Sequence, residues 1–152
     1  MKSPSTTADA AQHLAESVVR KMFAADTASQ MLGMRVAEVR PGYARVEMDV
    51  RAEMLNGHAI CHGGLIFSLA DSAFAFACNT HNFVTVAAAC SIDFLAPAQA
   101  GDHLVAEAVE QLLLGRTGIY DVTVTNQRGE RIAVFRGRSH RTREQIIASD
   151  NA

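Results

Sequence analysis

A long apolar run interrupted by one carboxylate, in residues 65–78, constrains the fold more than any other feature of the sequence. Its only polar side chains are Ser68, Asp71 and Ser72. A helix that is apolar on nearly every face is normally buried, either in a protein core or in a membrane. Fourteen residues are too few to span a bilayer, which requires about 20. We therefore expect a helix inside a folded protein, with Asp71 enclosed among apolar side chains.

Asp71 is the first candidate for chemistry, because an ionised carboxylate is costly to bury unless a partner or a function retains it. The alternative is a structural aspartate satisfied by Ser68 or by a neighbouring chain. His62 lies nine residues before Asp71, which corresponds to about 900° on a helix, or two full turns plus half a turn. The two side chains would point to opposite sides. A site that uses both forms more easily between two chains related by a two-fold axis.

The composition excludes several classes of protein. With 152 residues and a net charge of −2, the chain has room for one domain and lacks the basic character of nucleic-acid binders. Its first residues lack the apolar stretch of a signal peptide, and no segment is long enough to cross a membrane. The three cysteines show no CxxC spacing, which favours free thiols in a reducing compartment. We expect a cytoplasmic protein with neither nucleic-acid nor membrane partners.

Periodicity predicts an N-terminal helical segment, residues 1–33, followed by a set of strands. Residues 8–33 carry an intermittent apolar stripe that ends at Gly33. Two strands surround a Pro41-Gly42 turn, and the second alternates strictly between apolar and polar residues. These two strands cover residues 34–40 and 43–50, and after the apolar helix we expect strands over residues 84–95, 102–114, 118–126 and 131–140.

The order of these elements predicts the fold class. Short loops between consecutive strands imply antiparallel pairing. One apolar helix beside one antiparallel sheet indicates an α+β layer in which the sheet curls around the helix, not a doubly wound fold. We expect one domain over residues 34–140 and a polar, frayed tail over residues 141–152.

The pair Gly63-Gly64 begins the apolar helix. Backbone N–H groups at this position lack intrahelical partners and lie at the positive end of the helix dipole. They can therefore stabilise an oxyanion that develops on a carbonyl carbon under attack. The plainer alternative is a tight turn with close packing of the backbone. Asn56-Gly57, just upstream, also has the composition of a common tight turn.

We expect no metal and no cofactor. The residues His58, Cys61, His62 and Cys78 match no standard zinc spacing, and Cys78 lies too far around the helix from the preceding loop. Cys61 beside His62 is a weak candidate for a nucleophile, because adjacent side chains in a loop rarely form a supported triad.

The residues around this helix resemble those of a known family. The resemblance lies in the run HGGLIFSLADSAFAFACN, which follows MLNGH and precedes SIDFLAPAQAGD and VFRGRSHR. These segments closely resemble the hotdog-fold acyl-CoA thioesterases of the phenylacetic-acid degradation (PaaI) type, from about residue 33 to residue 140. The resemblance implies a long helix wrapped by an antiparallel sheet, dimers with a continuous sheet, tetramers as pairs of dimers, and active sites at the dimer interface.

The resemblance also implies roles for individual residues. Asp71 matches the essential carboxylate, which acts as a general base on water or as a direct nucleophile, and Gly63 matches the backbone donor to the thioester oxygen. His62 and Asn56 match positions that orient the thioester or the water. A hydroxyl on the following strand assists in some relatives, but residues 87–89 are all alanine here, so that group is absent or replaced by Thr85.

The same resemblance implies phenylacetyl-CoA or ring-hydroxylated phenylacetyl-CoA as the substrate. Gly64, Arg136 and Arg138 complete the candidate substrate-binding residues. The two arginines share a strand face with Ile132 and Val134, so we expect them to emerge at the end of the sheet. There they form either a phosphate site for coenzyme A or ordinary surface charge.

Other functions remain open alongside this one. A thioesterase for a different acyl group would need no other catalytic residues. A hydratase on the same fold usually carries an Asp and a His close together near the helix start, a pairing not found here. A non-enzymatic acyl-CoA sensor would need an output domain, and we expect none in this chain.

Overall fold

Alternation along the strands determines which of their side chains meet the central helix. Strand β2 (Tyr43–Asp49) fully buries Ala44, Val46 and Met48, as its sequence pattern predicts. The computed structural model describes residues 6–148. Strand β2 is hydrogen-bonded to a neighbouring strand on both sides. The result is a six-stranded antiparallel sheet of order β1-β2-β4-β5-β6-β3. The other strands are β1 (Arg35–Arg40), β3 (Phe83–Phe94), β4 (His103–Leu114), β5 (Thr117–Thr125) and β6 (Arg131–Gln145).

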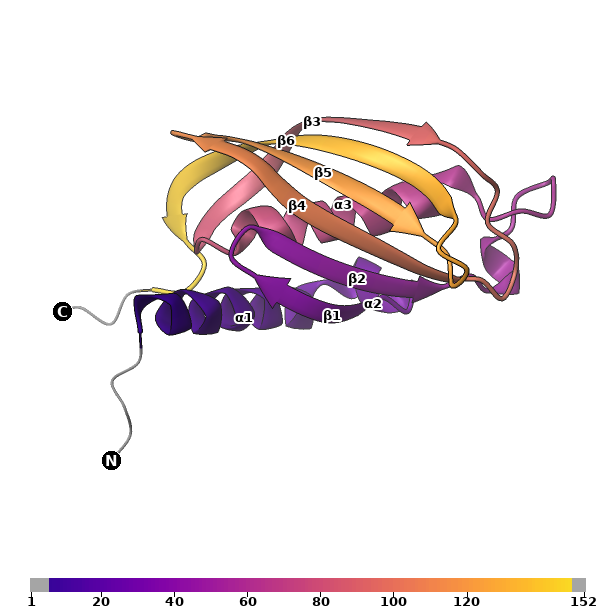
Figure 1. Ribbon diagram of the computed structural model, residues 1–152. Coiled ribbons are helices and arrows are strands. Elements are labelled where there is room, and N and C mark those ends of the chain that lie inside the picture. The colour runs from indigo at the N-terminus through magenta and orange to yellow at the C-terminus, as the bar shows by residue number, and fades with distance from the viewer. Residues whose placement is uncertain (1–5, 149–152) are drawn as a thin grey trace.

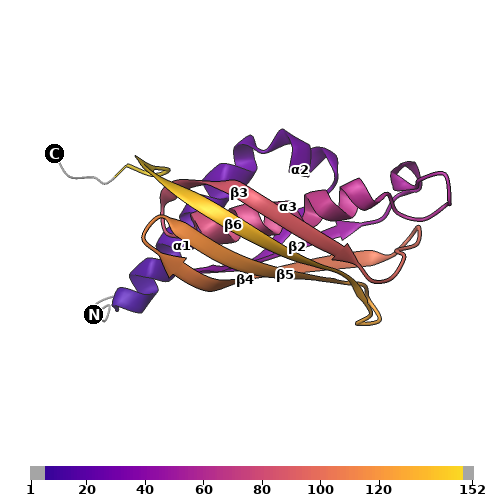
Figure 2. The same ribbon diagram turned by 90° about the horizontal axis from the view of Figure 1, so that it is seen from above.

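The sheet curves over one long helix, α3 (Gly63–Asn79), as Figures 1 and 2 show. This arrangement confirms the expected α+β class and the hotdog fold. The strands agree with the sequence-based prediction to within one residue at every end except the end of β6.

Helix α3 is fixed at its far end by one side chain. Asn79 donates through Nδ2 to the carbonyl of Thr85 at 3.0 Å and accepts the N–H of Thr85 at 2.9 Å. These two bonds satisfy a buried amide and join the end of the helix to the start of β3. The strand that follows α3 is therefore held alongside it.

The core lies between α3 and the inner face of the sheet. Phe74 of α3 packs against Tyr120 and Phe135, with ring centroids 5.6 and 5.8 Å away. The ring lies directly over Gly137 of β6, where a Cβ would come within 2.7 Å of it. Helix and sheet approach this closely because residue 137 has no side chain.

The N-terminal segment, expected to be helical over residues 8–33, forms two helices with a break between them. Helices α1 (Thr7–Ala25) and α2 (Thr27–Met31) are separated at Asp26, whose backbone is not helical. The Asp26 carboxylate accepts the N–H and the hydroxyl of Ser29 at 2.9 and 2.6 Å. This N-cap favours a new helix start over continuation of α1.

The frayed tail expected from residue 141 is wrong for its first part, because β6 continues to Gln145. Arg141 pairs with Thr85 of β3 in the sheet. Backbone pairing holds this stretch although its side chains are polar, and composition alone does not reveal that pairing. Residues 149–152 of the expected tail lie outside the described residues. Within residues 6–148, none of the helices has the length and apolar character needed to cross a membrane.

Candidate active site

The backbone N–H groups at the start of α3 are hydrogen-bond donors, and those without a partner in the protein are available to a ligand. His62 lies just before the helix, as predicted, and its Nδ1 accepts the N–H of Gly64 at 2.9 Å. A ring nitrogen that accepts carries no proton, so the neutral imidazole of this exposed side chain holds its proton on Nε2. The N–H of Gly64, predicted to contact substrate, is therefore already occupied.

The N–H of Gly63 has no hydrogen-bond partner among residues 6–148. Backbone N–H groups in the first turn of a helix lack intrahelical acceptors, and the helix dipole is positive there. Such a group suits an oxygen that carries or develops negative charge. Gly63 is thus the donor of the glycine pair that remains available.

A cleft of about 490 Å³ opens beside this N–H. Gly63 and Asn56 line it together with mainly apolar residues: Ile60, Cys61, Ile66, Phe94, Leu95, Ala96 and Pro97. The Phe94 ring is closest, because its Cζ would lie only 3.1 Å from a Cβ on residue 63. Phe94 and Leu95 are each 54% exposed, so part of each side chain is open to a ligand. Sequence reasoning missed these two residues.

Asn56 organises the loop that precedes α3. Its Oδ1 accepts the N–H groups of His58 at 2.9 Å and Ile60 at 3.4 Å. The backbone N–H of Asn56 donates to the carbonyl of Ile60 at 2.8 Å. These bonds form the turn that Asn-Gly favours. The side-chain NH₂ has no partner in the described part of the chain, so Asn56 also offers a donor to the cleft.

Asp71 is half-buried, not enclosed as the apolar sequence suggested. Its carboxylate has no hydrogen-bond or ion-pair partner among residues 6–148, since Ser68 donates instead to the carbonyl of Gly64 at 2.8 Å. Burial raises the pKa of Asp71, because a carboxylate removed from water without a partner is destabilised.

The side chain of Asp71 lies near the edge strand β3. The pKa of the Cys90 thiol, on β3, is raised by partial burial and further by the negative charge of Asp71. From Val86 to Ser91 the side chains of this strand are exposed on both faces, and the sheet order leaves its backbone without a neighbouring strand on one side. The stripe of α3 that carries Asp71 and the open strand β3 therefore form one surface.

The structure brings Asn56 and Gly63 together in the cleft, but not Asp71. Eight residues separate Asp71 from Gly63, which corresponds to about 12 Å along the helix axis. Asp71 does not line the cleft. His62 is the N-cap of α3, just before the helix and nine residues from Asp71.

Arg136 and Arg138 lie in the middle of β6, so their expected place at the end of the sheet is wrong. Both are exposed and alternate with the buried residues Phe135 and Gly137, which puts them on the face away from α3. Arg136 donates to Asp121 through Nε at 2.7 Å and Nη2 at 2.8 Å, and this contact raises the pKa of the guanidinium. Arg138 has no ion-pair partner among residues 6–148.

Other candidate groups are occupied or absent from this region. Residues 6–148 contain no group of three or more His, Cys, Asp or Glu side chains that could hold a metal ion. Thr85, the possible hydroxyl assistant, is buried and donates its hydroxyl to the carbonyl of Phe83 at 2.8 Å. Burial raises the pKa of the Cys61 thiol, which disfavours the thiolate that a nucleophile requires.

Comparisons with known proteins agree with this geometry. The family model "Thioesterase superfamily" matches residues 58–133. The acyl-coenzyme A thioesterase PaaI of Escherichia coli is 46% identical over 129 residues, which cover 85% of this chain and 92% of that protein. The structure of the E. coli PaaI protein from the phenylacetic acid degradation operon matches with a TM-score of 0.87 and 45% identity, covering 88% of this chain and 97% of that one. The Streptococcus mutans protein smu.793, bound to acetyl CoA, matches with a TM-score of 0.71 and 27% identity, covering 74% and 90%.

A curved antiparallel sheet over one helix, with an apolar cleft at the start of that helix, defines a hotdog-fold protein. The chain belongs to the thioesterase superfamily. It is an enzyme of the PaaI-like group, which confirms the resemblance found in the sequence.

Proposed function

We propose that the protein hydrolyses aryl-acyl-CoA thioesters, phenylacetyl-CoA or its ring-hydroxylated forms, to the free acid and coenzyme A. The proposal depends above all on Asp71, a half-buried carboxylate with a raised pKa and no partner among residues 6–148. Groups held in this way at a cost in stability are typical of active sites. The name of the E. coli relative and the acetyl CoA bound to the S. mutans protein support coenzyme A as the carrier of the acyl group.

In this proposal two groups divide the chemistry between them. The N–H of Gly63 donates to the thioester carbonyl oxygen and stabilises the negative charge that develops there. Asp71 takes a proton from the attacking water or attacks the carbonyl itself. The Nε2–H of His62 and the NH₂ of Asn56 orient the thioester or the water. Coenzyme A leaves as a thiolate, a good leaving group, so neither a metal nor a full triad is needed.

Both groups reach one thioester only if two chains meet. Gly63 and Asp71 are about 12 Å apart along α3 within one chain. β3 is an open edge strand, and such edges pair readily with another chain. Pairing of two β3 strands about a two-fold axis puts Asp71 of one chain near the Gly63 cleft of the other. We therefore propose a dimer with two equivalent sites, and tetramers built as pairs of dimers.

The proposed substrate contacts differ in how well the structure supports them. The Phe94 ring and the Leu95 methyl groups are partly exposed and form an apolar surface that suits an aromatic acyl group. Arg138 keeps its guanidinium available for the phosphates of coenzyme A. Arg136 is the weaker candidate, because Asp121 already occupies its guanidinium.

Steady-state hydrolysis by the Asp71→Asn variant tests the proposed site. The amide is nearly isosteric but is neither a base nor a nucleophile, so we expect kcat to fall about 10²-fold or more with an unchanged circular dichroism spectrum. Asp93→Asn is the matched control, because Asp93 pairs with Val134 on the sheet face away from α3 and should leave turnover unchanged. Wild-type turnover by Asp71→Asn would show that Asp71 is structural.

A panel of acyl-CoA thioesters tests the proposed acyl group. Release of free thiol is measured for aryl, short-chain and long-chain acyl groups, and we expect the highest kcat/KM for phenylacetyl-CoA and its ring-hydroxylated forms. A higher kcat/KM for a straight-chain acyl group would assign the enzyme to another substrate. Binding without turnover of any thioester would identify the sensor that the sequence left open.

A further inference from the structure

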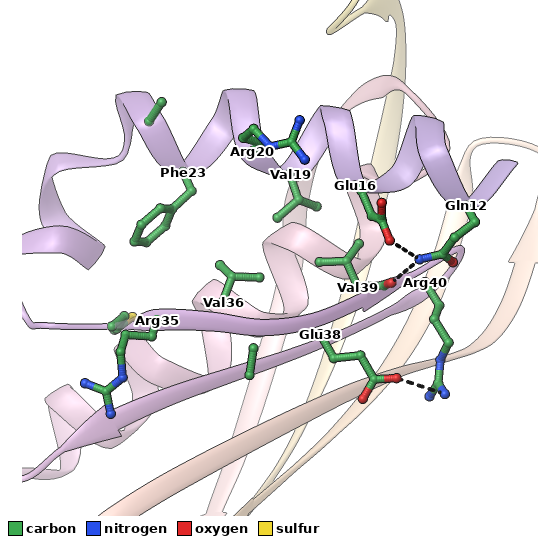
Figure 3. A pocket seen from close by; sticks show the side chains of 13 residues that line it. Gln12, Glu16, Val19, Arg20, Phe23, Arg35, Val36, Glu38, Val39 and Arg40 are labelled. Atoms are coloured by element: carbon green, nitrogen blue, oxygen red, sulfur yellow. Dashed lines mark hydrogen bonds and ion pairs between the residues drawn. The ribbon is translucent and has the colours of Figure 1, made fainter. Parts of the chain in front are cut away.

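A second cavity lies between the N-terminal helix and the first strand of the sheet. It measures about 900 Å³ and is bounded by α1 on one side and β1 on the other (Figure 3). This α1–β1 groove is defined by the α1 residues between Gln12 and Ala24 that face β1 and by residues 34–40. None of these residues belongs to the stretch, 58–133, that the thioesterase family model matches.

The interior of the groove is apolar. Val19 and Met34 lie at its base and are only 2% and 3% exposed. Figure 3 shows Val19 and Phe23 of α1 facing Val36 and Val39 of β1 across the gap. Sites for small organic molecules usually have volumes of about 300–1,000 Å³, a mainly apolar lining and a few placed polar groups. The groove has this size and this lining.

Both carboxylates that line the groove are already engaged. The side-chain amide of Gln12 donates to Glu16 and to the carbonyl of Val39, both at 2.7 Å, and thereby bridges α1 and β1 near one end (Figure 3). Glu38 forms an ion pair with Arg40 at 3.1 Å. Neither carboxylate is therefore available to pair with a cationic ligand.

Arg20 is the one groove-lining arginine without an ion-pair partner in the described part of the chain. The other two are paired, Arg40 with Glu38 at 3.1 Å and Arg35 with Asp49 at 3.1 Å. Figure 3 shows Arg20 on α1 beside Val19, above the apolar interior. An apolar cavity with an unpaired guanidinium at its rim is complementary to an organic anion with an apolar body.

We propose that the α1–β1 groove binds a small hydrophobic monocarboxylate, with its apolar body between Val19, Phe23 and Val36 and its carboxylate on Arg20. The binding does not depend on the chemistry at Asp71. Such an acid is also the class of compound that hydrolysis of an acyl thioester releases. On the proposed function, the groove therefore gives the product acid a second site, separate from the one where it forms.

Isothermal titration calorimetry of the whole 152-residue chain with 4-phenylbutyrate tests the proposal. We expect the Asp71→Asn variant to keep this binding. Arg20→Gln should weaken it about 10-fold, as expected when one charge-assisted contact is lost. Ala37→Trp, which puts a large side chain at an exposed position on β1 that lines the groove, should weaken it more than 10-fold. The exposed Arg143 lies outside the groove, so Arg143→Gln is the charge-matched control and should bind like wild type.

The neutral analogue 4-phenylbutyramide provides a second test that requires no variant. We expect it to bind the wild type about 10-fold more weakly than the acid, because it cannot pair with Arg20. Equal affinity for acid and amide, unchanged affinity in Ala37→Trp, or no measurable binding would each overturn the proposal. Loss of binding in Asp71→Asn alone would place the acid in the thioesterase site and would also overturn it.

Two further measurements distinguish this proposal from the proposed function and from a groove that holds a second copy of the chain. Arg20→Gln should hydrolyse saturating thioester at the wild-type rate, so failure of the groove proposal is distinct from failure of the proposed function. Light scattering at two protein concentrations reports whether Ala37→Trp dissociates an oligomer. Such dissociation would show that the groove holds a second copy of the chain instead of an acid, and would overturn the proposal.

Discussion

The proposed role of Asp71 predicts how kcat/KM of the reaction depends on pH. Burial disfavours the charged form, so this carboxyl keeps its proton to a higher pH than an exposed aspartate does. A base or a nucleophile must be deprotonated to act. We therefore predict that kcat/KM falls on the acid side with an apparent pKa above that of an exposed aspartate. A pH–rate profile of the wild type measures this, and a profile that stays flat down to about pH 4 would contradict it.

The burial of Asp71 also predicts an effect on stability. Because its pKa in the folded state is raised, the ionised carboxylate costs stability above that pKa, and the cost disappears as falling pH protonates the group. Asp71→Asn removes the charge, so it should raise Tm relative to wild type at pH 7, and the difference should close in acid. Calorimetric scans of both proteins at neutral and acidic pH measure the difference. An equal difference at both pH values would show that the amide acts through packing.

The sequence could predict a site residue only where the signal for that residue lies within a few neighbouring positions. Asp71 and Gly63 were found because one charge in an apolar run and a glycine pair before a helix are visible within a few residues. Phe94 was not found, because its contact with Gly63 joins positions 31 residues apart. Arg136 was ambiguous for the same reason, since its partner Asp121 lies on the neighbouring strand.

The contact between α3 and β6 depends on the absence of a side chain at position 137. A Cβ there would lie 2.7 Å from the Phe74 ring, which is 1% exposed and has no room to move aside. We predict that Gly137→Ala lowers the free energy of unfolding by about 1–3 kcal/mol, the usual cost of overpacking a core. Urea denaturation measures this change. At Gly57 no atom lies within 4 Å of an added Cβ, so Gly57→Ala is the control and should change stability little.

Elements with a regular pattern could be predicted, and elements that depend on partners could not. The alternation in residues 43–50 and the apolar run of α3 gave element ends close to those observed. The break at Asp26 was missed because a capping side chain, not a change in hydrophobic pattern, ends α1. The last residues of β6 were missed because backbone pairing to β3 leaves no trace in their polar composition.

For the whole molecule, the proposed site across two chains predicts complementation. His62→Ala and Asp71→Asn should each be inactive alone. A hybrid dimer of the two contains one site in which both residues are wild type. Free exchange of subunits at equal amounts should therefore restore about a quarter of wild-type activity. Thiol release by the exchanged mixture measures this recovery. Hybrids purified in two steps after co-expression with different tags should show about half of wild-type activity, because one of their two sites is intact.

Two results would contradict the shared site. Hybrid dimers that stay inactive would show that His62 and Asp71 of different chains do not serve one thioester. A fully active monomer, established by light scattering at the assay concentration, would show that one chain suffices. Mixing Asp71→Asn with itself under two tags is the control and should restore nothing.

The place of β3 in the sheet also has a consequence for how the chain is made. β3 pairs only with β6, although β4 and β5 lie between them in the sequence. A ribosome therefore releases α3 and β3 before it has synthesised the strand that holds β3 in place. Until residues 131–145 emerge, both edges of β3 stay open, a state that favours slow folding and association with other nascent chains. The surface around Asp71 is thus a part of the molecule that becomes ordered only after β6 has been synthesised.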